Sequence, residues 1–85
     1  MTAKVTIYTS SLCGFCYRAK HLLDSKNIVY DEISVDGNND IRKQMMTITN
    51  NRTVPQIIIN DRPIGGCDEL YALEHKNALD PLINS

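Results

Sequence analysis

Residues 5–20 read VTIYTSSLCGFCYRAK, and along them the pattern changes from that of a strand to that of a helix. Residues 4–8 alternate with a period of two, which predicts a β-strand. Over residues 14–26 the apolar positions follow helical spacing. Cys13 and Cys16 therefore come after a strand and lie at the start of a helix.

Turn residues divide the rest of the chain into short elements. Residues 28–35 and the β-branched run 56–59 are strand-like, and a last strand at 62–64 contains a proline, which confines it to a sheet edge. A helix is expected at 67–76, followed by an apolar turn at 82–83. Another helix, placed before the third strand, has an apolar stripe made of Ile41, Met45 and Ile48.

The resulting order, β-α-β-α-β-β-α, predicts an α/β fold with a single four-stranded mixed sheet. The first two strands need a helical crossover and are expected to be parallel, whereas the last two form an antiparallel hairpin. Three or more helices then cover the two faces. With 85 residues, the chain is expected to form a single domain over residues 1–85.

Composition argues against several classes of function. Nine basic and ten acidic residues give a formal net charge of −1, unlike the basic surface of a nucleic-acid-binding protein. No apolar run is long enough to cross a membrane, and the N-terminus lacks the apolar core of a signal peptide. We therefore expect a monomeric, cytoplasmic protein that binds neither nucleic acid nor membranes.

The three cysteines are too few for a secreted disulfide scaffold. A structural zinc site needs a fourth ligand, which neither His21 nor His75 supplies at a suitable spacing, so no metal is expected. Cys13 and Cys16 form a C-x-x-C pair beside a βαβ unit, which is typical of a thioredoxin-like redox motif. Cys67 is either a buried packing residue or a regulatory thiol.

The position of Cys13 favours redox chemistry. Only a thiolate attacks a disulfide, and the free N–H groups of a helix N-terminus stabilise negative charge. We expect the pKa of Cys13 to lie below the free-cysteine value of about 8.5. Cys16, almost one helical turn later, lies close enough to resolve a mixed disulfide on Cys13.

A second motif, T-V-P at residues 53–55, leads into the β-branched strand. If the bond before Pro55 is cis, the backbone N–H and C=O of Val54 turn outward and can pair with an extended peptide. If it is trans, the motif is an ordinary strand start.

A third motif, G-G-C-D-E at residues 65–69, opens the last predicted helix. Its glycines permit close approach of another backbone. The helix start could receive a carboxylate on its amides and an ammonium group on Asp68. Asp68 and Glu69 could equally act only as helix caps.

Together these motifs resemble the dithiol glutaredoxins, nearest to the bacterial glutaredoxin 3 type. The likeness covers nearly the whole chain, and C-x-x-C joined to T-V-P and G-G-C-D at these distances is highly specific. It also includes VTIYT at 5–9, RAK at 18–20, DGN at 36–38, TVPQI at 53–57, IGGCD at 64–68, LYAL at 70–73 and LDPL at 79–82.

The resemblance implies a thioredoxin fold with a cis Pro55, and a glutathione-dependent thiol–disulfide oxidoreductase. It makes Cys13 the nucleophile and Cys16 the resolving thiol in the reduction of protein disulfides and of glutathione mixed disulfides. It assigns to glutathione binding Phe15, Thr53, Val54 (for the cysteinyl part), Pro55, Gly66, Cys67 and Asp68 (for the γ-glutamyl end), and Arg42 (for the glycine carboxylate).

The chain departs from the usual family pattern at two places. The family's C-P-Y-C is C-G-F-C here, so Gly14 relaxes the turn and Phe15 lacks the tyrosine hydroxyl. A lysine common three residues before the first cysteine is replaced by Ser10, which removes a cation. We expect weaker glutathione binding and a less depressed Cys13 pKa than in relatives.

Two alternatives remain open at this point. One is a glutaredoxin-like redoxin reduced by thioredoxin reductase, against which the G-G-C-D motif argues. The other is an iron–sulfur cluster carrier, in which Cys13 of two subunits and two glutathione molecules hold the cluster. Gly14 favours the carrier, and Cys16 at the resolving position argues against it.

Overall fold

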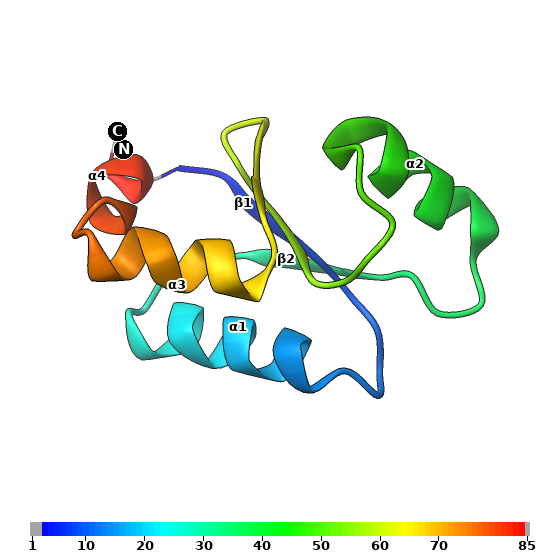
Figure 1. Ribbon diagram of the computed structural model, residues 1–85, viewed down its shortest axis with the longest axis horizontal. Coiled ribbons are helices and arrows are strands. Elements are labelled where there is room, and N and C mark those ends of the chain that lie inside the picture. Colours follow the sequence, from blue (N-terminus) through cyan, green and yellow to red (C-terminus); the bar gives the residue numbers. More distant parts are fainter. Residues whose placement is uncertain (1–2, 85) are drawn as a thin grey trace.

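A computed structural model describes residues 3–84 of the chain (Figure 1). The helices and strands follow the predicted order β-α-β-α-β-β-α, and one further short helix comes last. Their bounds are β1 Val5–Thr9, α1 Gly14–Ser25, β2 Asp31–Ser34, α2 Asn39–Thr49, β3 Gln56–Ile59, β4 Arg62–Gly65, α3 Cys67–His75 and α4 Leu79–Ile83.

The four strands form one mixed sheet in the order β2-β1-β3-β4. β1 and β2 are parallel and are joined through α1, whereas β1 with β3 and β3 with β4 are antiparallel. β4, which contains Pro63, is an edge strand, as expected for a residue without a backbone donor. The predicted topology is confirmed.

Helices cover both faces of the sheet (Figure 1). On one face, α1, α3 and α4 pack against alternate residues of β1 and β3 in the larger core cluster. On the other, Met45 of α2 packs with Tyr8, Val35 and Ile58. Because both faces are covered, all four residues of β3 are buried.

The two ends of the described chain lie together. The Ala3 N–H donates a hydrogen bond to the Ile83 carbonyl at 2.7 Å, which attaches α4 to the start of β1. The sequence predicts only an apolar turn here, but residues 79–83 form a helix that buries Leu79 and Ile83.

Two details of the predicted elements are wrong. The second strand begins at Asp31 rather than at residue 28, because Asn27 has a positive φ of 57° and the Ile28 N–H still bonds to Leu23 of α1. In α2, Ile48 is 41% exposed and Thr49 takes the buried position. The Thr49 hydroxyl donates a hydrogen bond to the Met45 carbonyl at 2.8 Å, so this buried polar group has a partner.

Within residues 3–84, no helix has the length and apolar character required to cross a membrane. The same residues contain no cluster of three or more histidine, cysteine or acidic side chains arranged to hold a metal ion.

Candidate active site

The two cysteines of the C-x-x-C motif lie at the N-terminus of α1 and form a disulfide. Cys13 is the N-cap residue, with an extended backbone (φ −133°), and its Cα lies 5.2 Å from that of Cys16. Cys13 is half-buried, whereas Cys16 is 1% exposed. An approaching thiol or disulfide therefore reaches Cys13 first.

The backbone at the start of α1 points toward the Cys13 sulfur. The Cys16 N–H donates to Cys13 Sγ at 3.0 Å, which is the contact an N-cap side chain makes. No acidic residue lies in the first turn of α1. The Cys16 amide is thus directed at the sulfur, without a competing carboxylate in the first turn of α1.

The loop before β3 lies against the same sulfur. The Val54–Pro55 bond is cis, as the family resemblance implies, and the Val54 carbonyl oxygen lies 3.8 Å from Cys13 Sγ. The Gln56 side-chain amide donates to the Thr53 carbonyl at 2.9 Å and holds the turn. Val54 lies outside the ladders of β3, so its backbone is not used in sheet pairing.

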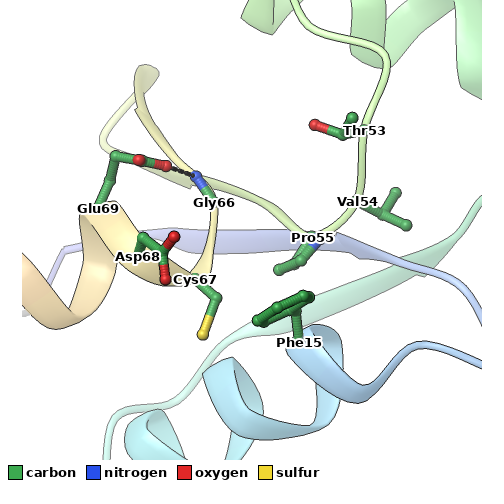
Figure 2. A pocket seen from close by; sticks show the side chains of 8 residues that line it. All are labelled: Phe15, Thr53, Val54, Pro55, Gly66, Cys67, Asp68 and Glu69. Carbon is green, nitrogen blue, oxygen red and sulfur yellow. Dashed lines mark hydrogen bonds between the residues drawn. The ribbon is translucent and has the colours of Figure 1, made fainter.

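The start of α3 approaches this loop through the glycine pair. A Cβ on Gly66 would lie 3.2 Å from the Pro55 carbonyl oxygen, so a side chain there would press on the loop. Gly65 has a φ of +120°, which favours glycine. The Gly66 N–H donates to Glu69 Oε1 at 2.6 Å (Figure 2). The predicted close approach of another backbone is confirmed at Gly66, whereas Gly65 lies against the Glu69 side chain.

These three motifs meet at one cavity of about 290 Å³ (Figure 2). The Phe15 ring forms one side, next to Pro55, and the first turn of α3 forms another. The lining residues are Phe15, Thr53, Val54, Pro55, Gly66, Cys67, Asp68 and Glu69.

The cavity contains all but one of the residues that the resemblance assigns to glutathione. The exception is Arg42, which lies exposed on α2 outside the lining, where its charge acts on Asp36. Sequence reasoning placed Glu69 in the first turn of the helix but did not assign it to the site. Its signal was its position three residues after an N-cap, where glutamate commonly reaches back to the cap amide.

Cys67 lines this cavity, and its environment differs from that of Cys13. It is 5% exposed, and burial is the main cause that raises the pKa of its thiol. Asp68 and Glu69 raise that pKa further, whereas Arg18 opposes the shift. The prediction of a buried cysteine is confirmed, and this thiol is harder to ionise than an ordinary one.

The loop before Cys13 is attached to the loop after β2. Ser10 Oγ donates to one oxygen of Asp36 at 2.7 Å, and the Ser11 N–H donates to the other at 2.8 Å. These bonds lower the pKa of Asp36. The serine that replaces the usual lysine therefore bonds to a carboxylate and brings no positive charge.

Large side chains next to the two cysteines in the sequence are exposed to solvent. Leu12 is 100% exposed, Phe15 56% and Tyr17 69%. The sequence places Phe15 on the apolar face of the helix, but it faces the cavity and not the core, because the sheet-facing side of α1 begins at Cys16.

Comparison with known proteins identifies the family. The family profile described as glutaredoxin matches residues 5–64. Glutaredoxin 3 of Escherichia coli strain K12 is 48% identical over 81 residues, which cover 95% of this chain and 98% of that protein. The chain belongs to the glutaredoxin family. A glutaredoxin of Pseudomonas aeruginosa is 42% identical over 95% of this chain and 96% of its own length.

Solved structures agree with this assignment. The buckwheat glutaredoxin–glutathione complex superposes with a TM-score of 0.88 at 29% identity, over 96% of this chain and 77% of the other. The solution structure of Brucella melitensis glutaredoxin gives 0.85 at 40% identity, over 96% and 89%. The fold is thus the thioredoxin fold of glutaredoxins.

With both cysteines of its C-x-x-C motif present, the chain is a dithiol glutaredoxin and a thiol–disulfide oxidoreductase. Its family uses glutathione as the reductant. Neither the redoxin reduced by thioredoxin reductase nor the iron–sulfur carrier is favoured over this function.

Proposed function

We propose that this glutaredoxin reduces protein disulfides and mixed disulfides of glutathione, with Cys13 as the nucleophile and Cys16 as the resolving thiol. The observation that carries these roles is the difference between the two sulfurs. Cys13 is half-buried and caps α1, whereas Cys16 is buried one turn below it.

On a glutathionylated substrate, the Cys13 thiolate attacks the glutathione sulfur. A Cys13–glutathione disulfide forms, and the substrate leaves as a thiolate that takes a proton from water. The thiolate of a second glutathione then attacks the glutathione sulfur bound to Cys13. Glutathione disulfide is released, and the Cys13 thiolate is regenerated.

On a protein disulfide, Cys13 forms a mixed disulfide with one substrate sulfur and releases the other as a thiol. Cys16 then loses its proton and attacks Cys13 Sγ, so that the second substrate sulfur leaves reduced. This produces the Cys13–Cys16 disulfide. Two glutathione molecules reduce that bond and leave as glutathione disulfide.

The cavity supports the glutathione part of the proposal. We assign the cysteinyl backbone of glutathione to Val54, whose carbonyl lies beside Cys13 Sγ, and the γ-glutamyl carboxylate to the first amides of α3. Asp68 would take the ammonium group. Thr53 and Phe15 would form the walls, and Arg42 remains a prediction for the glycine carboxylate.

The proposal extends to the setting of the enzyme. A catalytic cysteine pair that exchanges electrons with glutathione suits a reducing compartment, so we propose the cytoplasm. We also propose that residues 1–85 act as one monomeric glutaredoxin domain.

A glutathione-coupled assay on three variants tests the assigned roles. Cys13→Ser is expected to be inactive on both substrate classes. Cys16→Ser is expected to keep the reduction of glutathione mixed disulfides and to lose the reduction of protein disulfides. Asp61→Asn, on the exposed β3–β4 turn outside the cavity, is the control and is expected to keep both. An active Cys13→Ser enzyme would show that the nucleophile is wrongly assigned.

A further inference from the structure

We propose that Gln56 is a positioning residue for the transfer of glutathione, because its side-chain amide fixes Thr53 in the wall of the cavity. The inference rests on the proposed function, since it concerns how the same enzyme holds a glutathione substrate at Cys13. It gives a role to a buried polar side chain that the sequence motifs and the reaction steps leave unexplained.

The loop that contains Thr53 and Val54 lies beyond the paired part of the sheet. β3 pairs with β1 only from Gln56 onward, where Gln56 lies opposite Tyr8. Val54 still has to be placed accurately, because its carbonyl oxygen lies 3.8 Å from Cys13 Sγ. A side chain that reaches back over this turn can therefore set the position of the loop relative to the nucleophile.

Gln56 makes this connection. Its Nε2 donates to the Thr53 carbonyl oxygen at 2.9 Å and to the Thr53 hydroxyl oxygen at 3.3 Å. Among residues 3–84, no other side chain bonds to Thr53. Gln56 is 2% exposed and its backbone belongs to the sheet, so the contact starts from a fixed point. Thr53 is thereby connected to the sheet across the turn.

The orientation of the Gln56 amide is determined by the same contact. Within the described part of the chain, Gln56 Oε1 is the one buried side-chain oxygen or nitrogen that lacks a hydrogen-bond partner. If the amide oxygen and nitrogen were exchanged, an oxygen would face the Thr53 carbonyl oxygen, and two acceptors form no hydrogen bond. Unpaired buried polar atoms are rare in folded proteins. A glutamine here is therefore better explained by its bonds to Thr53 than by packing.

The contact also determines what the Thr53 hydroxyl can do. A hydroxyl group has one proton to donate and lone pairs with which it accepts. Because the Thr53 oxygen accepts from Gln56, its proton is left for an acceptor in the cavity that Thr53 lines (Figure 2). A carbonyl or carboxylate oxygen of a bound tripeptide is such an acceptor. Gln56 itself is not among the lining residues, so it acts through Thr53.

The probe is a pair of mixed disulfides with the same leaving group, 5-thio-2-nitrobenzoate. One contains glutathione, and the other contains 2-mercaptoethanol, which has no peptide for Thr53 to bind. The Cys13 thiolate of the fully reduced enzyme attacks the glutathione or mercaptoethanol sulfur and forms a new disulfide with it. The coloured nitrothiobenzoate thiolate leaves with the electron pair. Its absorbance gives a second-order rate constant for each substrate, and the ratio of the two constants is the preference for glutathione.

Three variants separate the lost donor from other effects. Gln56→Met removes the donor and keeps an unbranched side chain of similar length, whereas Gln56→Leu removes the same donor with a side chain of different shape. Gln44→Met is the matched control, since it makes the same change at an exposed position of α2 outside the cavity. Both rate constants are measured on one sample, so inactive enzyme lowers them alike and leaves their ratio unchanged.

The wild-type enzyme is expected to prefer the glutathione substrate. Both Gln56 variants are expected to lower this preference about two- to tenfold, the range for one neutral hydrogen bond, by slowing the reaction with the glutathione substrate alone. Gln44→Met should leave the preference unchanged. In a Thr53→Val background, which has no hydroxyl to orient, Gln56→Met should lower the preference by a smaller factor, because the effects of residues in contact are not additive.

A preference in the Gln56 variants equal to that of the wild type would overturn the inference. Unequal preferences in Gln56→Met and Gln56→Leu would also overturn it, because the effect would then come from packing. So would an equal factor with and without the Thr53 hydroxyl, because Gln56 would then not act through that group. Failure of the proposed function would look different, since the wild-type enzyme itself would show no preference for glutathione.

Discussion

At the scale of single residues, Gly65 and Gly14 differ in how much space a side chain would have. Gly65 has a φ of +120°, and a Cβ there would meet Glu69 at 2.7 Å. Gly14, in the active-site motif, has no heavy atom within 4 Å of a Cβ. A change to alanine should therefore destabilise the protein at Gly65 but not at Gly14.

Gly65→Ala is expected to lower the free energy of unfolding by about 1–3 kcal/mol, because alanine must adopt a strained backbone and displace Glu69. Gly14→Ala is expected to be neutral or stabilising, since alanine favours a helix. Urea unfolding of both variants measures the difference. Equal stabilities for the two variants would contradict this account of the glycine pair.

At the scale of elements, α1 begins in a way that suits proline. Gly14 is its first residue, Cys13 before it has an extended backbone, and there is open space at the Cβ position. Proline at the first position of a helix removes only an N–H that has no helical acceptor.

Gly14→Pro is therefore expected to raise the free energy of unfolding by about 0.4–1 kcal/mol through the loss of unfolded-state freedom. Urea unfolding of the reduced protein checks this, because reduction separates the backbone effect from the disulfide. A clear loss of stability would mean that the start of α1 needs the flexibility of glycine.

The connection between the loop before Cys13 and the loop after β2 depends on Asp36. Its pKa is lowered chiefly by the Ser10 hydroxyl and the Ser11 N–H, so folding favours the carboxylate form. This contribution to stability is complete above the pKa of an unfolded aspartate, about 3.9, and is lost as the pH falls through the lower folded value.

Asp36→Asn should accordingly be less stable than wild type at pH 7, and the difference should shrink below about pH 4. Urea unfolding at a series of pH values measures it. A difference that persists unchanged at pH 2.5 would mean that the aspartate acts through shape and not through charge.

At the scale of the whole molecule, stability rests on the larger core cluster. Leu23 of α1 is 0% exposed within this cluster, whereas Ile48 of α2 is 41% exposed. Leu23→Ala is expected to lower the free energy of unfolding by about 2–5 kcal/mol. Ile48→Ala is expected to change it by less than about 1 kcal/mol. Urea unfolding of the two variants measures this difference. An equal loss of unfolding free energy in both variants would contradict the burial pattern.

The sequence predicts the architecture well where local patterns agree with the final packing. Three local patterns predict the position of a strand in the sheet correctly. They are the alternation in β1, the β-branched run of β3 and the proline of β4. Residues 28–30 were wrongly predicted to begin the second strand because they are apolar or aromatic. Val29 is nevertheless 87% exposed, at the point where the chain leaves α1. Their position depends on how the helix ends at Asn27, which no side-chain periodicity shows.

The site is predictable in its parts but not in its assembly. Each motif has a local signal, and the family resemblance indicates which residues converge. Glu69 was not assigned to the site, because a glutamate three residues after a helix cap has a sufficient structural explanation. Its place in the cavity beside Asp68 is known only from the structure.

The central claim is that the start of α1 ionises the Cys13 sulfur, while burial keeps Cys67 as a thiol. Its most direct test is the rate of iodoacetamide alkylation of each cysteine in the reduced protein as a function of pH, read by peptide mass spectrometry. A midpoint for Cys13 below that for Cys67 is the predicted result. Equal midpoints, or a higher one for Cys13, would contradict the account.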